Sequence, residues 1–182
     1  HCGDVLQLHT YAKKEIKRDY KRPEYKNETK LSDNLVKWFE ARGISQHVLR
    51  VANITEGKEW MPQTKCEVNT IQFNYFRNNE LINVKYRDAR KNFKMYKDAE
   101  KILYNIDSIL NTKEAVIVEG EFDALSYSEA GIHNVVSVPN GFNLKGTLNL
   151  DYLDNYIDIF ENKEKVFIAV DNDEAGQKGA KE

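Results

Sequence analysis

The spacing of apolar and polar residues predicts helices near the start of the chain. In residues 31–42 the apolar positions recur at helical spacing, Ser32 or Asp33 can cap the N-terminus, and Gly43 can end the helix. A second short helix is expected over residues 45–49. The first helix therefore has one apolar stripe to bury.

Residues 71–87 alternate between apolar and polar side chains on either side of two consecutive asparagines. Alternation with a period of two, interrupted by a short turn, predicts a β-hairpin. In its second strand the alternation separates two faces, with Ile82, Val84 and Tyr86 on one and Asn83, Lys85 and Arg87 on the other. We expect the face that carries Lys85 and Arg87 to point outward and to be cationic.

From Glu114 onward, short apolar runs alternate with segments of helical character. Strands are predicted over residues 115–120, 135–139 and 166–170, and helices over residues 121–130, 151–160 and 174–182. The short connections between them favour a parallel sheet with helices packed on it, and therefore an α/β fold. Residues 166–170 are apolar without a polar break, as expected for a buried strand.

Four carboxylates are predicted to meet at one edge of this parallel sheet. Asp171 and Asp173 follow the last predicted strand, Glu119 ends another strand, and Asp123 lies one helical turn after Glu119. These side chains can converge because the carboxyl ends of parallel strands share an edge. Four acids at one place need a metal ion, or some of them must stay protonated. Two carboxylates two residues apart suit a hard cation such as Mg²⁺, and Gly176 allows the tight turn that aims them.

The segment of residues 165–176 also permits three other interpretations. An EF-hand requires an oxygen ligand at its fifth position, which is Ala175 when counted from Asp171, and a helix in place of the strand before the loop. A phosphatase with an aspartate nucleophile needs a further site that nothing else in the sequence supplies. The acids could also be solvated side chains at the end of a strand.

The net charge of −2 conceals an uneven distribution of charged residues. Residues 1–110 contain 21 Lys and Arg against 15 Asp and Glu, whereas residues 111–182 contain 6 against 14. The basic part can attract a polyanion and the acidic part can gather cations, although an unevenly charged solvated surface has the same composition. Lysines and aromatic residues alternate in residues 91–97, which suits phosphates and stacked bases, with an exposed charged hairpin as the alternative. Trp38 is expected in the core or in an interface rather than as a platform for bases.

Cysteine content, hydropathy and missing motifs narrow the class of protein further. Cys2 and Cys66 are the only cysteines, so no disulfide framework and a reducing compartment are expected. The triplet at residues 1–3 resembles the end of a zinc ribbon, but zinc is not expected in this chain. No run approaches eighteen apolar residues and no signal peptide is visible, so we expect no membrane contact. Without a GxxxxGK[ST] motif, ATP-driven unwinding is not expected either.

Two acidic motifs together resemble the signatures of the TOPRIM domain, which primases, topoisomerases and some nucleases share. The first is VEGEFD at residues 118–123, and the second is VDND followed by EAG at residues 170–176. The stretch KYRDARKNFK, residues 85–94, resembles the segment before the TOPRIM fold in bacteriophage primase-helicases and Twinkle-type helicases. ARGIS, residues 41–45, resembles the start of their primase core. The resemblance extends over residues 31–182.

This resemblance implies a role for each candidate site residue. Glu119 would act as the general base or organise the attacking hydroxyl, and Asp123 would support the metal site. The implied residues are Glu119 and Asp123 for catalysis; Asp171, Asp173 and Glu119 for Mg²⁺ or Mn²⁺; Lys85 and Lys91 for the phosphates of the incoming nucleotide; and Arg87, Arg90 and Lys94 for DNA.

The resemblance also implies an activity and a domain organisation. The chain would be the RNA-polymerising core of a DNA primase, which joins ribonucleoside triphosphates on a single-stranded DNA template during DNA replication. A basic linker at residues 1–30, after the end of a zinc ribbon, would precede a mixed α+β primase subdomain at residues 31–110 and a C-terminally truncated TOPRIM domain at residues 111–182. A replicative helicase, on the same or a separate chain, would be its partner in the cytoplasm of a bacterial or phage-infected cell.

Two alternatives to a primase remain open at this point. One is a catalytically silent TOPRIM module that binds DNA within a replicative helicase. The other is a TOPRIM nuclease or topoisomerase, which shares the acids but provides no reason for the basic stretch at residues 85–94.

Overall fold

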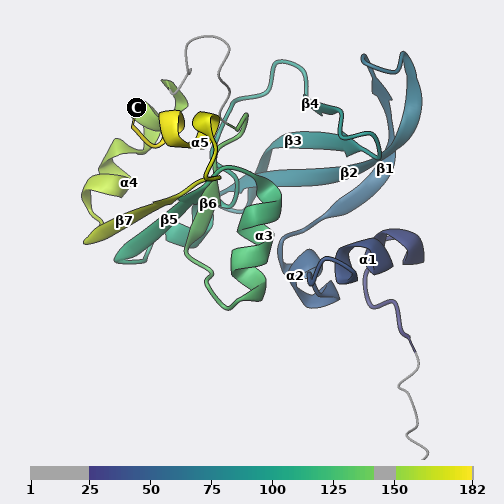
Figure 1. The fold of residues 1–182 in the computed structure, drawn as a ribbon, viewed down its shortest axis with the longest axis horizontal. Helices are drawn as coiled ribbons and strands as arrows, with labels where there is room; N and C mark the ends of the chain where they lie inside the picture. Colours follow the sequence, from purple (N-terminus) through teal and green to yellow (C-terminus); the bar gives the residue numbers. More distant parts are fainter. Residues whose placement is uncertain (1–24, 142–150, 182) are drawn as a thin grey trace, which may run out of the picture.

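Two β-sheets share one hydrophobic core in this protein (Figure 1). The computed structural model describes residues 25–141 and 151–181. The resemblance to a zinc ribbon at residues 1–3 and most of the predicted basic linker fall outside these residues. The first sheet is antiparallel with the strand order β1-β2-β3-β4, and the second is parallel with the order β6-β5-β7.

Two short helices precede the first sheet, α1 (Asp33–Glu40) and α2 (Gln46–Val51). Their N-caps are Ser32 and Ser45, whose hydroxyl groups accept hydrogen bonds from the backbone N–H groups of Leu35 and Val48. Gly43 follows α1 with a φ of 75°, a conformation that favours glycine. Both predicted helices and the predicted stop signal are therefore confirmed, with Ser32 rather than Asp33 as the first cap.

The antiparallel sheet contains the predicted hairpin and two further strands. Its strands are β1 (Thr55–Met61), β2 (Cys66–Arg77), β3 (Glu80–Asp88) and β4 (Phe93–Met95). Arg77 pairs with Glu80, so Asn78 and Asn79 form a two-residue turn, and both have positive φ values of 53° and 63°. This turn geometry is the one that asparagine tolerates best after glycine, and it confirms the hairpin.

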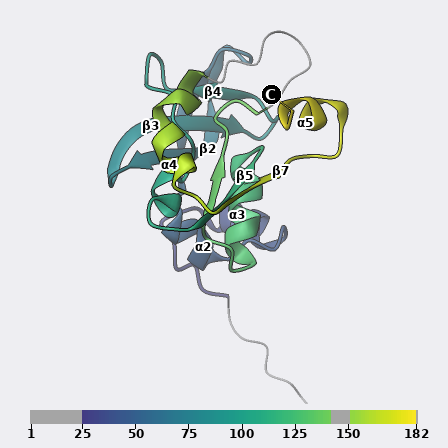
Figure 2. The same cartoon turned by 90° about the vertical axis from the view of Figure 1, so that its left-hand side faces the viewer.

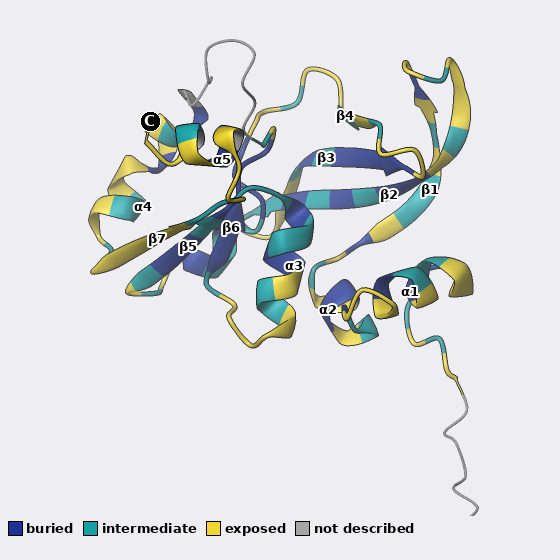
Figure 3. Cartoon of the chain, in the orientation of Figure 1, coloured by how far each residue is buried: buried dark blue, intermediate teal, exposed yellow. Residues whose placement is uncertain are grey.

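The predicted orientation of the hairpin is wrong. Asn83, Lys85 and Arg87 are only 3%, 9% and 8% exposed, so the face expected to point outward is buried (Figure 3). The same face of β2 carries Ile71, Phe73 and Tyr75, all buried in the core. The period-two alternation is present, but it does not reveal which face packs inward. Aromatic rings and a buried carboxylate hold the two cations there, as described below.

The parallel sheet alternates with helices as predicted, and the α/β fold class is confirmed. Its strands are β5 (Glu114–Val118), β6 (Val135–Ser137) and β7 (Lys165–Ala169). Its helical segments are η1 (Ile106–Ile109), α3 (Glu121–Glu129), η2 (Asp151–Tyr156), α4 (Ile157–Glu161) and α5 (Glu174–Gly179). Figure 2 shows β5 beside β7, with α3 next to them. Val118 pairs with both Ser137 and Ala169, so the three strands end at the same edge.

The strand expected to be buried, β7, lies exposed at the edge of the parallel sheet. Val166, Phe167 and Ile168 are 40%, 49% and 53% exposed (Figure 3). Among the described strands β7 pairs only with β5, and its apolar side chains on both faces remain in contact with solvent. The expectation of a buried strand at residues 166–170 is therefore wrong for the described residues.

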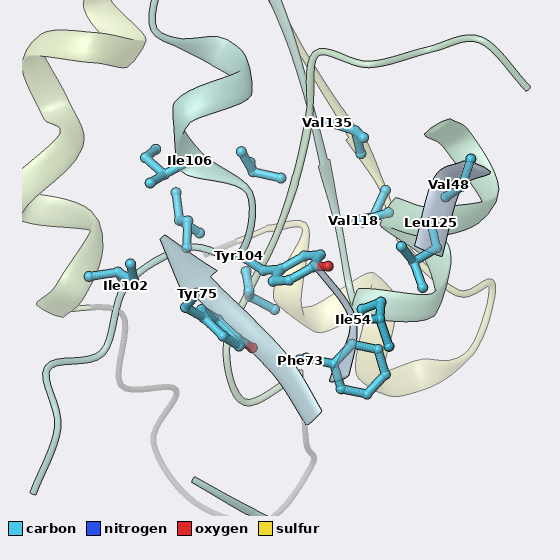
Figure 4. Close-up of a cluster of buried hydrophobic side chains, with 14 of the residues drawn as sticks. Val48, Ile54, Phe73, Tyr75, Ile102, Tyr104, Ile106, Val118, Leu125 and Val135 are labelled. Carbon is cyan, nitrogen blue, oxygen red and sulfur yellow. The ribbon is translucent and has the colours of Figure 1, made fainter. Parts of the chain in front are cut away.

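One continuous hydrophobic cluster joins the two sheets (Figure 4). It combines Phe73 and Tyr75 from β2 with Val118 from β5 and Leu125 from α3. The predicted division of the chain at residues 110 and 111 stays a prediction. In the part of the chain that the structure describes, no helix has both the length and the apolar character needed to cross a membrane.

Candidate active-site cleft

Three of the four predicted acids line one cleft at the carboxyl edge of the parallel sheet. Glu119, Asp123 and Asp171 surround a hollow of about 520 Å³ together with Lys85 and Lys94 from the antiparallel sheet. We call this hollow the acidic cleft. Residues 139–141, the loop after β6, also line it. Acidic residues from one sheet and basic residues from the other thus face the same space.

Local backbone geometry explains how each acid reaches the cleft. Glu119 follows β5 directly, and Asp123 lies in the first turn of α3, where its carboxylate accepts a hydrogen bond from the Gly120 N–H at 3.0 Å. Asp171 lies in the tight turn between β7 and α5. A Cβ atom on Gly176 would overlap the carbonyl oxygen of Asp171, so this turn requires glycine, as the sequence predicts.

The acids of the cleft influence one another electrostatically. Burial raises the pKa of Asp123, and the negative charge of Asp171 raises it further, against the opposing effect of the Gly120 hydrogen bond. Carboxylate oxygens that repel one another at an open edge fit a hard divalent cation, which would relieve this repulsion. Among the described residues, no three His, Cys, Asp or Glu side chains form a group close enough to hold one ion.

The fourth predicted acid, Asp173, has a different position. It is the N-cap of α5, and its Oδ1 accepts a hydrogen bond from the Gly176 N–H at 2.8 Å. Asp173 is exposed and does not line the acidic cleft. Its carboxylate therefore stabilises the start of a helix in this structure.

A buried carboxylate that the sequence interpretation missed also lines the cleft. Glu121, the first residue of α3, is 2% exposed. The Lys85 ammonium donates hydrogen bonds to its two oxygens at 2.8 and 3.0 Å, and the Tyr75 hydroxyl donates to Oε1. Burial, followed by the charge of Glu121, raises the pKa of Tyr75 well above its ordinary value, so the phenol keeps its proton. The VEGEFD motif contains two glutamates, and only the packing of α3 on β2 and β3 separates their roles.

The remaining predicted cations divide between two places. Lys94 lines the acidic cleft and forms an ion pair with Glu59 at 2.7 Å. Arg87 and Lys91 line a second hollow beside Trp38, and Arg90 is exposed and lines neither hollow. Lys85 and Lys91, predicted to act on the same nucleotide, therefore face different spaces.

Comparison with known protein families gives a match for the C-terminal part of the chain. Residues 116–182 match the family described as Toprim-like. The chain is 34% identical over 162 residues to the Twinkle homolog protein, chloroplastic/mitochondrial, of Arabidopsis thaliana. It is 35% identical over 163 residues to the primase homolog protein of the same plant. Each match covers 84% of this chain, which spans 22% of the first relative and 46% of the second.

A similar structure supports the same relationship. The primase fragment of the bacteriophage T7 primase-helicase protein superimposes with a TM-score of 0.60 and 26% sequence identity. The match covers 79% of this chain and 57% of that fragment. The similarity therefore extends beyond the Toprim-like residues into the antiparallel sheet, and the predicted resemblance to TOPRIM primases is confirmed.

Proposed function

We propose that this chain, whose residues 116–182 match the Toprim-like family, is the RNA-polymerising core of a DNA primase. It joins ribonucleotides on a single-stranded DNA template. The observation that carries the proposal is the convergence of Glu119, Asp123 and Asp171 on a cleft that Lys85 and Lys94 also line. Phosphoryl transfer needs acids that hold a metal ion and cations around the same phosphates, and the carboxylates and ammonium groups that line this cleft support the proposal.

The proposed metal ligands are Asp171, Asp173 and Glu119, with Asp123 as support. Bound Mg²⁺ or Mn²⁺ would neutralise charge on the transferring phosphate and lower the pKa of the attacking hydroxyl. Glu119 would accept or orient the proton of that hydroxyl, because it lies at the end of β5 inside the cleft. Oδ1 of Asp173 accepts the hydrogen bond from the Gly176 N–H, so as a ligand Asp173 would offer the ion its other carboxylate oxygen.

The basic residues are proposed to hold the phosphates. An ammonium group has three N–H donors, and the two hydrogen bonds from Lys85 to Glu121 leave one donor for a phosphate of the incoming nucleotide. Lys91 would contact another phosphate of the incoming nucleotide. The proposed DNA contacts are Arg87, Arg90 and Lys94.

The wider setting is also a proposal. Both curated relatives are longer than the matched region, so we propose that the core works with a replicative helicase, on the same or a separate chain. A bacterial or phage-infected cell remains the proposed location, although one relative is described as chloroplastic/mitochondrial.

Extension of a diribonucleotide on single-stranded DNA, with ribonucleoside triphosphates and Mg²⁺ or Mn²⁺, tests the proposal directly. Glu119→Gln and Asp171→Asn are expected to lower the extension rate by about 100-fold or more. Asp158→Asn removes an exposed acid of α4 outside the cleft and is the matched control, expected to extend at the parent rate. Parent-level extension by both cleft variants would contradict the assigned roles.

One observation favours the catalytically silent module as a second candidate. The Asp173 carboxylate is already engaged as a helix cap and lies outside the cleft lining. Binding of single-stranded DNA without any extension, by the parent protein and by a longer chain, would support that candidate. Cleavage of DNA in the absence of nucleotides would instead support a nuclease.

A further inference from the structure

A hollow of about 180 Å³ opens where α2, α3 and η1 meet, and we call it the α2–α3 hollow. The helices α2 and α3 lie side by side (Figure 1). Val48 and Val51 from α2 line the hollow together with Ala124 and Leu125 from α3. Among the described residues it shares no lining residue with the acidic cleft, and none of its lining residues belongs to the acidic motifs or to the basic stretch. The α2–α3 hollow is therefore separate from the site described above.

The size and the apolar walls of the α2–α3 hollow suit a single ring. An apolar cavity of about 150 Å³ is large enough to hold one benzene molecule. No Asp, Glu, Lys or Arg of the described residues lines the hollow, and its two histidines are exposed to solvent. A charged group placed inside would lose its hydration without gaining a partner of opposite sign. The walls therefore favour an uncharged ring.

Tyr104 brings a buried hydroxyl group to this hollow. The residue is 3% exposed, and its hydroxyl has no hydrogen-bond partner among the described residues. Figure 4 shows the hydroxyl pointing toward the side of Leu125, which also lines the hollow. Backbone hydrogen bonds with Ser137, at 3.0 and 3.2 Å, hold Tyr104 in place. Burial raises the pKa of Tyr104, so the phenol keeps its proton and can donate it to an acceptor.

The other polar groups inside the hollow are engaged by the protein itself. The Asn105 amide and the Ser108 hydroxyl both donate to the carbonyl oxygen of Val135, at 2.9 and 3.1 Å. The Ser128 hydroxyl donates to the Ala124 carbonyl oxygen at 2.9 Å. Among the described residues that line the hollow, the tyrosine hydroxyl is the only buried side-chain polar group without a partner. A ligand that carries an acceptor can supply that partner.

We propose that the α2–α3 hollow binds a small uncharged molecule with one six-membered ring and one hydrogen-bond acceptor, the acceptor pairing with the Tyr104 hydroxyl. The ring covers the apolar side chains of Val48 and Leu125, which removes apolar surface from water. The acceptor, a carbonyl oxygen or a ring nitrogen, gives the buried hydroxyl its hydrogen bond. This binding does not depend on the proposed polymerase function.

A neighbouring hollow of about 300 Å³ fits such a ligand less well. It shares Tyr104 with the α2–α3 hollow, and its other lining residues include three asparagines besides Asn105 and one aspartate, Asp107. The Asp107 carboxylate accepts hydrogen bonds from the backbone N–H groups of Asn78 and Asn79, at 2.8 and 3.0 Å. An uncharged ring gains less from walls of amide and carboxylate groups than from aliphatic walls. The ring is therefore assigned to the α2–α3 hollow.

The helix α3 connects the α2–α3 hollow to the acidic cleft. Its first turn carries Glu121 and Asp123, which line the cleft, and its later residues line the hollow. The Tyr104 ring also packs against the Tyr75 ring, with 5.2 Å between the centroids, and the Tyr75 hydroxyl donates to Glu121. A bound molecule would thus contact the helix that carries two acids of the cleft, without entering the cleft itself.

Three probes with the same number of non-hydrogen atoms test the proposal. Acetophenone has a ring and a carbonyl acceptor, α-methylstyrene has a CH₂ group in place of the carbonyl oxygen, and benzoate carries a negative charge. Each probe is titrated into the protein without metal ions or nucleotides, and backbone amide signals are followed by NMR. We expect acetophenone to bind with a dissociation constant of about 1 mM or below and to shift the signals of Val48 and Leu125 saturably. Benzoate should leave these signals in place.

Tyr104→Phe removes only the hydroxyl group and tests the hydrogen bond. We expect it to lower the affinity for acetophenone by about 5-fold, whereas the affinity for α-methylstyrene should not fall. Comparing the two probes on both proteins cancels the difference in their hydrophobicity. The variant should fold as the parent does, because the hydroxyl has no partner among the described residues, and thermal unfolding checks this.

Two serines of α3 provide a matched pair that locates the ligand. Ser126 and Ser128 each donate to the carbonyl oxygen four residues earlier, but only Ser128 lines the hollow and Ser126 is exposed. Ser128→Leu should fill part of the hollow and abolish the binding of acetophenone and α-methylstyrene. Ser126→Leu makes the same substitution on the same helix and should bind both probes as the parent does.

Several results would overturn the proposal. These are no saturable shift with acetophenone up to its solubility limit, binding of benzoate as strong as that of acetophenone, or an unchanged acetophenone affinity in Tyr104→Phe. Loss of binding in Ser126→Leu equal to that in Ser128→Leu would also place the ligand outside the hollow. Because the titrations contain no nucleotides or metal ions, a failed extension assay with intact acetophenone binding would reject the polymerase proposal and leave this site standing.

Discussion

Lys85 and Arg87 lie two residues apart on the same buried face of β3, yet their surroundings differ. Lys85 meets the buried carboxylate of Glu121, which two hydrogen bonds and a Tyr75 hydroxyl fix in place. Arg87 meets the rings of Trp38, Phe93 and Phe122 and the like charge of Arg42. Lys85 therefore has a carboxylate partner in the fold, whereas Arg87, within the described residues, forms no ion pair with a carboxylate.

The largest expected effect comes from breaking the buried pair. Glu121→Gln leaves the Lys85 ammonium without a counter-charge in a place where its side chain is 11% exposed. We expect the free energy of unfolding to fall by about 3 kcal/mol, because removing one member of a buried ion pair strands the other. Chemical denaturation of the variant and the parent measures the difference.

Two controls isolate the effect of burial. Glu164→Gln breaks the exposed pair with Lys113, whose side chains are 62% and 80% exposed, and should change stability by less than about 0.5 kcal/mol. A double variant, Lys85→Met with Glu121→Leu, removes both charges and should recover part of the loss. If Glu121→Gln were as stable as Glu164→Gln, the Lys85–Glu121 pair would not be structural.

An intermediate effect is expected at Arg87. Arg87→Met removes a cation that lies among three rings, so the loss of those ring contacts is offset by relief of a buried charge. The free energy of unfolding should stay within about 1 kcal/mol of the parent value, well short of the loss in Glu121→Gln. A loss as large as that of Glu121→Gln, in the same denaturation experiment, would mean that Arg87 also stabilises the fold. Lys85 and Arg87 would then not differ in this respect.

The smallest effect is expected at a solvent-exposed ion pair between Arg77, at the end of β2, and Glu100. Arg77 donates to both oxygens of Glu100, at 2.7 and 2.8 Å, and these hydrogen bonds lower the pKa of Glu100. A lowered pKa in the folded state means that the pair stabilises the fold above the ordinary glutamate pKa. This contribution is lost as the pH falls through the lowered value.

Comparing the parent with Glu100→Gln across pH checks this third case. The parent should be slightly more stable at neutral pH, and the difference should vanish in acid, once Glu100 is protonated in the folded state. Thermal unfolding from neutral pH down to pH values below the lowered pKa of Glu100 records both limits. A difference that grew toward acid would reverse the assigned sign.

Local sequence patterns correctly predicted the caps and turns described here and three of the acids that line the cleft. Ser32 and Ser45 cap helices, the two asparagines at residues 78 and 79 turn the hairpin, and Gly176 makes the turn after Asp171, since each depends on backbone geometry within a few residues. The convergence of Glu119, Asp123 and Asp171 followed from the rule that parallel strands end at one edge.

The tertiary structure alone decided which faces are buried and which charges are paired. The alternation of apolar and polar residues shows that Lys85 and Arg87 share a face of β3. It does not show that α3 brings Glu121 against that face, because Lys85 and Glu121 are 36 positions apart in the sequence. An apolar run likewise cannot show whether β7 has neighbours on both sides, and here it is an exposed edge. Burial and charge pairing depend on contacts between distant parts of the chain, and a local pattern of residues does not predict these contacts.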